Sequence, residues 1–561
     1  MRLQKLFFLF IILIIIVLPL VNAKSGHISL LTVTSSNHTE GGIANVYLEV
    51  KPGTGRIFID SFPLTKLDTQ ISTRFANEIA CDFLDEDCSR YDFFYTIRAK
   101  ATIVGGPSAG AAMTVLTISV LSDLNLDENT IMTGTINSGN LIGPVAGINE
   151  KINAAVKNGF TKIIIPKWQS TINITEIKEN GLEEKITIVK VKNLEETLYH
   201  FTGKDFSKKN YELAISKEYI DLMKETSEIL CNRTQIIIGE LEPSNGSIYI
   251  SAERFWNRSF EANAVRDYYA RASYCFSANL RLRELQFENK NQEELSEIHS
   301  TILEELESIE NYVNNVELET LSDLETYMIV KERISEAKGY LEKVDSQNIS
   351  STQIAYAKER LYSAIVWVNF FSLGGEPIQL EESHLRDACI KKAAEAEERI
   401  NYARLYVPGL VEQSEKNIQD AMNNYDEGEF ALCIFKASKA KAEANILLTA
   451  LTTSEEDIEN VLEEKLDAIK NIIIEQDSKN MFPILGYSYY EYSKSLTEHD
   501  IISSVNFAEY ALELSKLDMY FPNEKKFSFN INFDVVQTFV IGIMTGILLI
   551  LLITFQRKKK R

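Results

Sequence analysis

The stretch GGPSAGAAMTVLTI spans residues 105–118 and joins a glycine- and proline-rich turn to an apolar run. This pattern predicts a helix that starts near Pro107, with Ser108 in its first turn. Backbone N–H groups at a helix start lack intrahelical acceptors and can bind an anion. Ser108 is therefore either an ordinary helix cap or a nucleophile held beside an anion-binding site.

The residues around this stretch alternate between strand-like and helix-like patterns from His27 to about Gly203. Apolar or alternating runs rich in β-branched residues predict strands, and Gly and Pro mark the joins. Helical patterns lie between them, at residues 69–84, 107–121, 149–158 and 194–200. We expect residues 24–205 to form an α+β or α/β domain of the kind that enzymes use.

After Phe206 the composition changes, because glycine and proline become scarce while Glu, Lys, Ala, Leu and Tyr increase. This composition is typical of long helices. Four segments rich in small residues resemble one another, at residues 268–285, 355–371, 429–451 and 503–521. Small residues at helical spacing let helices approach closely, so residues 206–530 are predicted to form a helical bundle or a short solenoid.

The two ends of the chain indicate a compartment. Residues 1–23 have a basic start, an apolar run and small residues before a cleavage point after Ala23, which is typical of a secretory signal peptide. Residues 535–555 are apolar over a length that crosses a bilayer, and the basic tail 556–561 follows. We expect a single-pass cell-membrane protein with its body outside and its C-terminus in the cytoplasm. An uncleaved first segment would add a second span without changing this orientation.

Cysteines and glycosylation motifs point to the same exterior location. The chain has six cysteines, an even number, and we expect the pairs Cys81–Cys88, Cys231–Cys275 and Cys389–Cys433 among the many connectivities that six allow. N-x-S/T sequons occur at Asn37, Asn173, Asn232, Asn245, Asn257 and Asn348. The net charge of −22 argues against a nucleic-acid partner, which needs a basic face.

A second segment, MTGTINSGNLIGPVAGINEKINAAVKNGFTKIIIP at residues 132–166, supplies a candidate base. It places Lys151 at the start of an amphipathic helix, where the helix dipole disfavours a cation. Burial beside a positive helix end lowers the pKa of a lysine, and a neutral amine can take a proton from a hydroxyl. Such a lysine would make Ser108 nucleophilic without any histidine.

The motifs GGPSAGAAM, MTG, GPVAGINEK and GFTKIIIP, in this order, resemble the proteolytic domain of Lon-type proteases over about a third of the chain. The resemblance implies a Ser-Lys dyad in which Ser108 is the nucleophile and Lys151 is the general base that later protonates the leaving amine. Thr133 would orient the lysine. The supporting residues Gly106, Pro107 and Ala109 would surround Ser108 at the helix start that lines the oxyanion hole.

The sequence also departs from the family pattern. Many Lon-type proteases have Asp where this chain has Gly105, and Glu where it has Thr135. No G-x-x-x-x-G-K-[ST] motif accompanies the domain, so cleavage should not use ATP in cis and should favour unfolded or flexible polypeptides. The scattered histidines predict no metal site, and we expect no cofactor.

The resulting interpretation is a membrane-anchored, outward-facing serine endopeptidase with a helical scaffold that holds the catalytic unit above the membrane. The resemblance further implies a homo-oligomer, because Lon-type domains commonly form rings. The composition, rich in Ile, Lys, Asn and Glu, suits an archaeal surface protein. The alternative is a non-catalytic surface protein for binding or scaffolding, and Gly105 and Thr135 are the residues that favour it.

Overall fold

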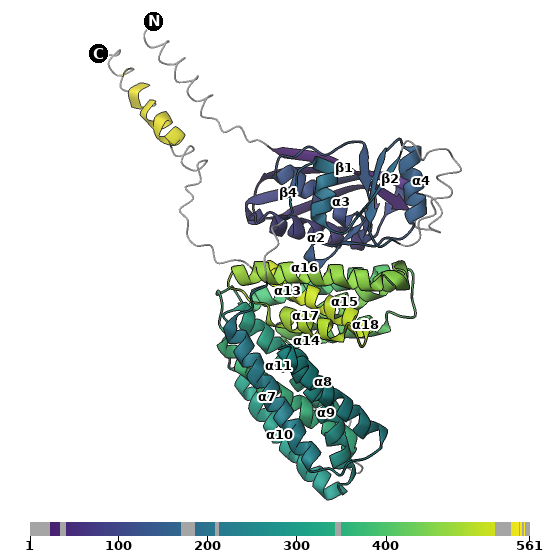
Figure 1. Cartoon of the computed structure of the whole chain (residues 1–561). Coiled ribbons are helices and arrows are strands. Elements are labelled where there is room, and N and C mark those ends of the chain that lie inside the picture. The colour runs from purple at the N-terminus through teal and green to yellow at the C-terminus, as the bar shows by residue number, and fades with distance from the viewer. Residues whose placement is uncertain are drawn as a thin grey trace.

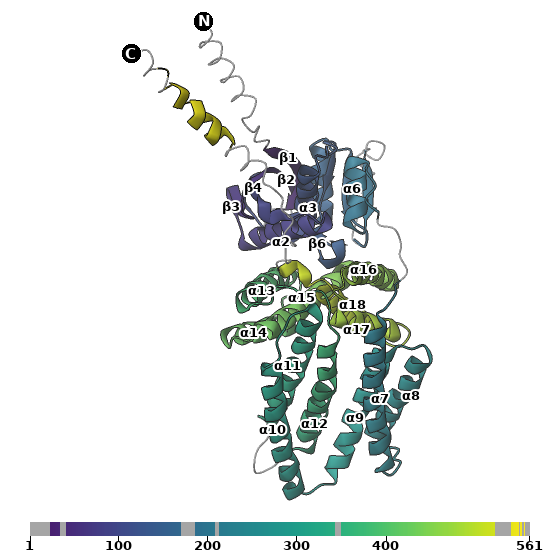
Figure 2. The same ribbon diagram turned by 90° about the vertical axis from the view of Figure 1, so that its left-hand side faces the viewer.

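The computed structural model describes residues 23–33, 41–169, 186–207, 213–342, 349–521, 540–548, 550–552 and 555. An α/β domain, a layer of helices packed against it, and a set of long helices beyond that layer follow one another in space (Figure 1). The same order is visible after a quarter turn (Figure 2). The predicted division into an N-terminal mixed domain and a helical region is confirmed.

A seven-stranded mixed sheet forms the body of the first domain, with the spatial order β3-β4-β2-β1-β5-β8-β9. Its strands are β1 (Lys24–Val33), β2 (Gly41–Pro52), β3 (Ile57–Thr65), β4 (Tyr91–Val104), β5 (Thr130–Met132), β8 (Lys162–Pro166) and β9 (Thr187–Val191). The pairs β1-β2 and β2-β4 are antiparallel, and the other neighbours are parallel. The parallel pairings give the domain an α/β character.

Helices cover both faces of this sheet. They are α2 (Leu67–Phe83), α3 (Gly110–Leu121), α4 (Ile148–Lys157) and α6 (Leu194–Thr202). Side chains alternate between the faces of a strand, so Leu30 belongs to the core shared with α2, α3 and α6, whereas its neighbour Leu31 packs with α4. Helix α3 is apolar on all sides and is buried along almost its whole length.

Short elements connect these layers near the two sequence motifs. They are the turns η1 (Cys88–Arg90), η2 (Pro107–Ala109) and η3 (Ser138–Asn140), and the small hairpin of β6 (Thr135–Ile136) and β7 (Ile142–Gly143). Turn η2 leads directly into α3, and the hairpin lies between β5 and α4 along the chain.

The described residues of the helical region form four successive triplets of helices. The first two are α7 (Lys217–Gly239), α8 (Ser247–Ala264), α9 (Tyr268–Glu288), α10 (Gln292–Asn314), α11 (Leu321–Leu341) and α12 (Ser351–Trp367). The last two are α13 (Glu382–Arg404), α14 (Glu412–Asp426), α15 (Phe430–Thr452), α16 (Ile458–Ser478), α17 (Ile484–Leu496) and α18 (Ile501–Leu514). The four similar sequence segments correspond to α9, α12, α15 and α18, the third helix of each triplet. Turns η5 (Val368–Ser372), η6 (Glu455–Asp457) and η7 (Asp518–Tyr520) complete the region.

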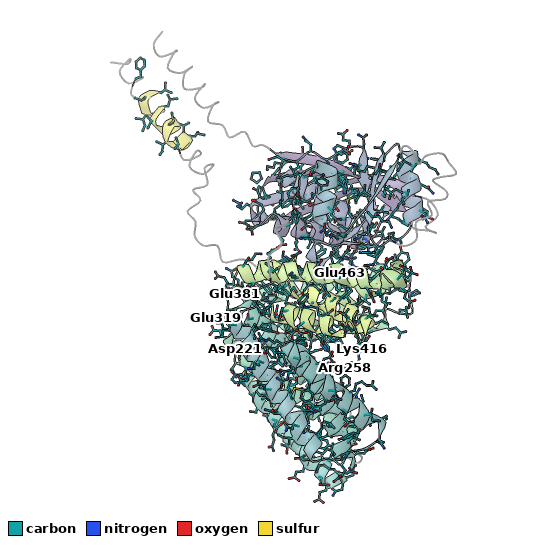
Figure 3. All side chains as sticks on the ribbon, viewed as in Figure 1. Asp221, Arg258, Glu319, Glu381, Lys416 and Glu463 are labelled. Carbon is teal, nitrogen blue, oxygen red and sulfur yellow. A yellow bond between two sulfur atoms is a disulfide. The ribbon has the colours of Figure 1, made fainter. Side chains whose placement is uncertain are left out.

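Charged side chains cover the outer faces of this region. Asp221, Glu319, Glu381, Lys416 and Glu463 are all exposed (Figure 3). The inner faces carry the alanine, leucine and aromatic side chains of one large core. The acidic composition of the chain is therefore largely a solvated surface.

All three predicted disulfides are present. Cys81–Cys88 joins the end of α2 to η1. Cys231–Cys275 joins α7 to α9, and Cys389–Cys433 joins α13 to α15, each with a sequence separation of 44. Both long-range bridges thus connect the first and third helices of a triplet.

The predicted targeting segments fall mostly outside the described residues. The signal peptide at 1–23 is described only at Ala23, and the basic tail 556–561 is not described. Of the expected span at 535–555, only 540–548, 550–552 and 555 are described, chiefly as helix. Within the described residues, every helix is too short or too polar to traverse a bilayer. The predicted C-terminal transmembrane helix therefore has no support from the described structure.

The third and fourth triplets pack directly on the α/β domain (Figure 2). Met519, beside the end of the last triplet, packs against the core of the first domain. Lys516 lies 2.5 Å from Asp82, and Lys391 lies 2.9 Å from Glu78, so ion pairs join α2 to the helical region. This face of the α/β domain also carries η2 and η3.

Candidate active site

Ser108 lies in η2, one short turn before the buried helix α3. Gly106 precedes it with φ of 101°, a conformation that favours glycine, and Pro107 occupies the first turn. The Ser108 side chain caps neither helix, and within the described residues its hydroxyl makes no hydrogen bond. The structure therefore rejects the ordinary helix-cap interpretation of this serine, and the half-buried hydroxyl remains available for another role.

Lys151 lies in the first turn of α4, after Gly147 turns the chain with φ of 62°. Its side chain is only 1% exposed, and none of the ion pairs among the described residues includes it. Burial lowers the pKa of Lys151 to about 7, and the nearby charge of Glu150 only partly opposes this shift. Near neutral pH, a substantial share of the molecules therefore carries a neutral amine at this position.

Thr133 connects the two motif residues. The Lys151 Nζ donates a hydrogen bond of 3.1 Å to Thr133 Oγ1, and this hydroxyl donates one of 3.3 Å to the Ser108 carbonyl oxygen. The Gly134 N–H reinforces the link by donating to the same carbonyl at 3.0 Å. The structure thus brings Ser108, Thr133 and Lys151 together around one buried hydroxyl. Their catalytic roles remain predictions.

A small cavity lies beside Ser108. Its volume is about 20 Å³, which accommodates a single water molecule. The end of β1 supplies one wall, and Gly105, Gly106, Ala109 and Met113 contribute to the others. Pro107 and Ala109, two of the predicted supporting residues, are buried on either side of Ser108.

The two positions where the sequence departs from the family pattern have distinct surroundings. Gly105 lies under the side chain of Lys66, because a Cβ atom at residue 105 would come within 2.6 Å of the Lys66 Cδ. Thr135 is fully buried in β6, and its hydroxyl has no hydrogen-bond partner among the described residues. Neither position gives Lys151 an acidic neighbour.

In the part of the chain that the structure describes, no three His, Cys, Asp or Glu side chains lie close enough together to hold a metal ion. The site geometry consists of a hydroxyl, an amine, a bridging threonine and the N–H groups of a helix start. These groups suit nucleophilic attack on a carbonyl carbon and stabilisation of the oxyanion that forms.

Sequence reasoning missed the contribution of the helical region to this site. The Arg399 Nη2 donates to the Ile136 carbonyl oxygen at 3.2 Å, and the Tyr402 hydroxyl accepts a hydrogen bond of 3.0 Å from the Ala146 N–H. Both residues lie near the end of α13. No motif in the helical half points to them, because only the docking of the two regions brings them to the site.

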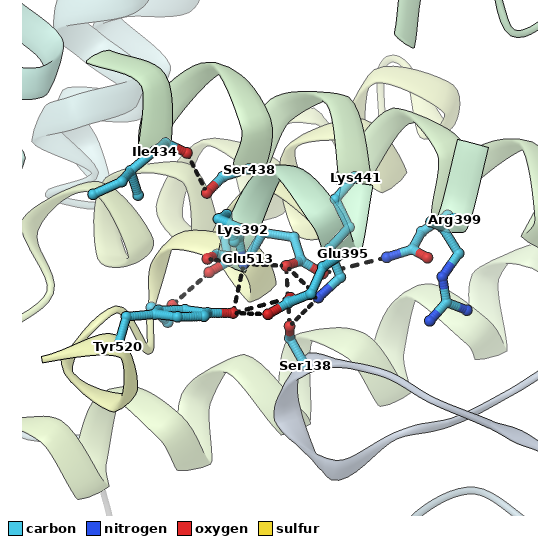
Figure 4. Close-up of polar contacts among 12 residues, drawn as sticks. Ser138, Lys392, Glu395, Arg399, Ile434, Ser438, Lys441, Glu513 and Tyr520 are labelled. Atoms are coloured by element: carbon cyan, nitrogen blue, oxygen red, sulfur yellow. Dashed lines mark hydrogen bonds and ion pairs between the residues drawn. The ribbon is translucent and has the colours of Figure 1, made fainter. Parts of the chain in front are cut away.

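A buried charged cluster between the two regions was also missed (Figure 4). The Lys392 Nζ lies 2.6 Å from Glu513 Oε2, and the Lys441 Nζ lies 2.7 Å from Glu395 Oε2 and 3.1 Å from Glu513 Oε2. The first domain contributes Ser138, whose hydroxyl donates to Glu513 at 3.0 Å. Lysines and glutamates interrupt the alanine-rich faces of α13 and α15, which is a sequence signal for buried charges but does not identify their partners.

In this cluster, burial and the neighbouring opposite charges shift each pKa in opposite directions. Burial raises the pKa of Glu513, but Lys392 and Lys441 outweigh it and bring that pKa down to about 2. Burial likewise lowers the pKa of Lys441, but Glu395 and Glu513 outweigh it and raise that pKa above its usual value. Glu513 and Lys441 are therefore charged at neutral pH, whereas burial outweighs Glu513 at Lys392 and lowers the pKa of that lysine.

The comparisons with known proteins converge on the segment that contains the site. The family model described as Lon protease (S16) C-terminal proteolytic domain matches residues 77–203. The Lon protease of Fervidobacterium nodosum is 28% identical over 176 residues, which cover 31% of this chain and 22% of that protein. The Lon protease of Trichlorobacter lovleyi is 37% identical over 102 residues, which cover 18% of this chain and 12% of that protein.

A third relative shows the same limits of coverage. The Lon protease of Phenylobacterium zucineum is 43% identical over 75 residues, which cover 13% of this chain and 10% of that protein. The chain thus spans about a fifth or less of the length of these relatives. The similarity is to the proteolytic domain of Lon proteases, and the matched residues 77–203 contain Ser108, Thr133 and Lys151.

Proposed function

We propose that this chain is a serine endopeptidase with a Ser108/Lys151 dyad that hydrolyses peptide bonds of unfolded or flexible polypeptides. The observation that carries the proposal is the buried Lys151 amine, which has a pKa of about 7 and is joined through Thr133 to the backbone of Ser108. A general base works best when its pKa lies near the working pH. The similarity of residues 77–203 to the Lon proteolytic domain supports the same activity.

In the first half of the reaction, the neutral Lys151 Nζ takes the proton of the Ser108 hydroxyl. The Ser108 Oγ forms a bond to the carbonyl carbon of the substrate, and the carbonyl oxygen becomes an oxyanion beside the N–H groups at the start of η2 and α3. The Lys151 ammonium then gives its proton to the leaving amine as the peptide C–N bond breaks. For the first proton transfer, the Ser108 side chain rotates so that its hydroxyl meets the Lys151 amine. Catalytic hydrogen bonds commonly form only when substrate is bound.

In the second half, the acyl group on Ser108 is transferred to water. Lys151, neutral again, takes a proton from a water molecule that attacks the acyl carbon. The ester bond breaks, the Ser108 oxygen recovers a proton from the lysine, and the peptide leaves with a new carboxyl group. No nucleotide takes part in any of these steps.

The test compares the full chain with its Ser108→Ala variant on unfolded casein. Ser108→Ala removes one oxygen and leaves the helix start intact, so the variant should keep the wild-type melting temperature while cleavage disappears. A serine-reactive phosphonate should label wild type at Ser108, as mapped by peptide mass spectrometry, and should not label the variant. Equal cleavage by both proteins would exclude this dyad.

The second candidate is a non-catalytic binding or scaffold protein. The observations that favour it are the absence of a hydrogen bond from the Ser108 hydroxyl within the described residues and the lack of an acid at Gly105 and Thr135. The phosphonate decides between the two candidates. A chain that stays unlabelled even at about pH 9, where Lys151 is neutral, is a scaffold.

We further propose that the chain is exported, anchored to the cell membrane through residues 535–555, and assembled as a homo-oligomer, with its C-terminus in the cytoplasm. Three disulfides support an oxidising exterior, because such bonds are rare in reducing compartments. The sequons at Asn232, Asn245 and Asn257 lie on exposed residues. Protease protection of membrane vesicles tests the orientation, and light scattering of the detergent-solubilised chain tests the oligomer.

A further inference from the structure

A single side chain of the helical region binds one motif segment of the α/β domain and lies beside the other. The Ala146 N–H, in the segment that leads to Lys151, donates a 3.0 Å hydrogen bond to the Tyr402 hydroxyl. On the other side, a Cβ atom at Gly106 would lie 3.9 Å from the Tyr402 ring, which places the ring against the turn that leads to Ser108. Tyr402 therefore lies between the serine turn and the lysine loop.

Its surroundings hold Tyr402 firmly in this place. The side chain is 6% exposed, and burial raises the pKa of its hydroxyl, so the group stays protonated near neutral pH. The Tyr402 and Tyr406 rings meet edge to face at 5.4 Å. About one turn earlier on α13, Arg399 binds the Ile136 carbonyl oxygen, and so fixes the helix against β6.

The loop at residues 144–147 determines where α4 begins and therefore where Lys151 lies. Side chains hold two successive N–H groups of this loop. Val145 donates to the Gln169 Oε1 at 3.1 Å, within the α/β domain, and Ala146 donates to Tyr402 of the helical region. One of these two hydrogen bonds to the lysine loop thus comes from outside the matched proteolytic segment.

We propose that Tyr402 is a positioning residue of the peptidase, which completes the active site by holding the 144–147 loop so that Lys151 meets Thr133 beside Ser108. This inference rests on the proposed function and deepens it, since it makes the docked helical region part of the catalytic unit. Catalysis is sensitive to displacements of about 1 Å in such groups. Loss of the Tyr402 hydroxyl leaves the Ala146 N–H without its partner and lets the loop relax towards solvent.

The experiment uses the full chain with Tyr402→Phe, which keeps the ring and removes only the hydroxyl. We expect kcat to fall about tenfold with little change in KM, because the loop holds the base rather than the substrate. The acid limb of the kcat–pH profile should move to higher pH, since Lys151 gains water while Glu150 remains its charged neighbour. The matched control is Tyr274→Phe, a buried tyrosine whose hydroxyl binds Ser495 within the helical region at 2.9 Å. It should match wild type in both respects.

A readout without catalysis separates this inference from the proposed function. In a Ser108→Ala background, the pH dependence of Lys151 acylation by acetic anhydride, followed by peptide mass spectrometry, reports the titration of the amine directly. The Tyr402→Phe change should move that titration upwards, whether or not the chain cleaves peptides. If Tyr402→Phe leaves both the Lys151 titration and kcat at their wild-type values, the inference is overturned. A rise in kcat also overturns it, because Tyr402 would then restrict catalysis instead of supporting it. Cleavage by Ser108→Ala would overturn the dyad alone.

Discussion

Lys151 and Lys441 are both 1% exposed, yet the protein treats the two buried amines in opposite ways. Lys151 has a hydroxyl partner and makes no ion pair among the described residues, and burial lowers its pKa to about 7 against the weaker opposing effect of Glu150. Lys441 faces Glu395 and Glu513, and these carboxylates raise its pKa above the usual value despite the same burial. The difference shows that two carboxylates outweigh burial at Lys441, whereas the charge of Glu150 alone does not outweigh it at Lys151.

The carboxylates around Lys441 have a structural role and take no part in the proposed reaction. The cluster of Lys392, Glu395, Lys441 and Glu513 lies where the α/β domain and the helical region meet, and Ser138 reaches into it from the first domain. A buried ionic cluster stabilises a protein only when all its members are paired. It therefore favours one docking position of the helical region, the position that also places Tyr402 at the lysine loop.

The largest expected effect comes from breaking the paired environment with Glu513→Gln. The change leaves Lys392 and Lys441 with one carboxylate fewer, so we expect the free energy of unfolding to fall by about 3–5 kcal/mol at pH 7. Urea denaturation measures this loss, with the exposed Glu463→Gln as the control, which should change by less than about 0.5 kcal/mol. A matching result for both variants would mean that the cluster does not hold the regions together.

The same carboxylate predicts a pH dependence with a definite sign. The pKa of Glu513 is about 2 in the folded chain, against 4.5 for an unperturbed glutamate. Because the folded value is the lower one, its contribution is complete above about pH 5 and is lost as the pH falls towards 2. The difference between wild type and Glu513→Gln should shrink over that interval.

The second prediction concerns a variant that gives Lys151 a carboxylate neighbour, as Lys441 has in the charged cluster. Thr133→Asp puts a carboxylate beside the Lys151 amine, which should raise the pKa of Lys151 by about 2 units or more. The fraction of neutral base at pH 7 then falls, and we expect kcat on casein to drop about 100-fold. Thr133→Val, which removes the hydroxyl without adding charge, should lose less. Equal losses in the two variants would contradict the electrostatic explanation.

The third prediction concerns the folding free energy that is lost by burying the Lys151 amine away from water. Its folded pKa of about 7 lies below the ordinary 10.5, so the unfolded chain binds more protons between these values and stability rises with pH across that interval. Lys151→Met removes a penalty of at most about 5 kcal/mol and also loses the Thr133 hydrogen bond, so it should stabilise the chain by a few kcal/mol near pH 6, with no gain above about pH 10.5. Denaturation curves at several pH values between these limits test the sign, and a pH-independent change would refute it.

The smallest expected effect belongs to a neutral member of the cluster. The Tyr520 hydroxyl donates to Glu395 at 2.8 Å, and Tyr520→Phe removes this hydrogen bond without removing a charge. We expect a loss of about 1 kcal/mol in the free energy of unfolding. The exposed Tyr199→Phe is the control for the substitution itself. A loss as large as that of Glu513→Gln would show that the cluster depends on hydrogen bonds more than on charges.

Local sequence patterns predicted much of the fold and of the candidate site. Gly106 and Pro107 before an apolar run predicted the helix start at Ser108, and Gly147 before an amphipathic run predicted the one at Lys151, because backbone geometry fixes both. The three disulfides and the recurring third helix of each triplet were equally visible. These features depend on short stretches of chain or on simple periodicity.

Such patterns could not predict which residues of the helical region contact the active site. Tyr402 lies more than two hundred residues from Ala146 in sequence, and nothing in the composition of α13 specifies which surface it covers. The pairing of Ser138 with Glu513 bridges a still longer interval. Only the complementarity of two folded surfaces brings these groups together, and one sequence does not display it.

The two bridges of equal span, Cys231–Cys275 and Cys389–Cys433, close two covalent rings in the helical region, one in the first triplet and one in the third. Each ring restricts its own segment of the unfolded chain. A reductant therefore removes two separate covalent restraints, although both triplets share one core. Opening the first ring frees the first triplet of its covalent restraint, whereas opening the second removes the covalent restraint on α13, the helix that carries Tyr402.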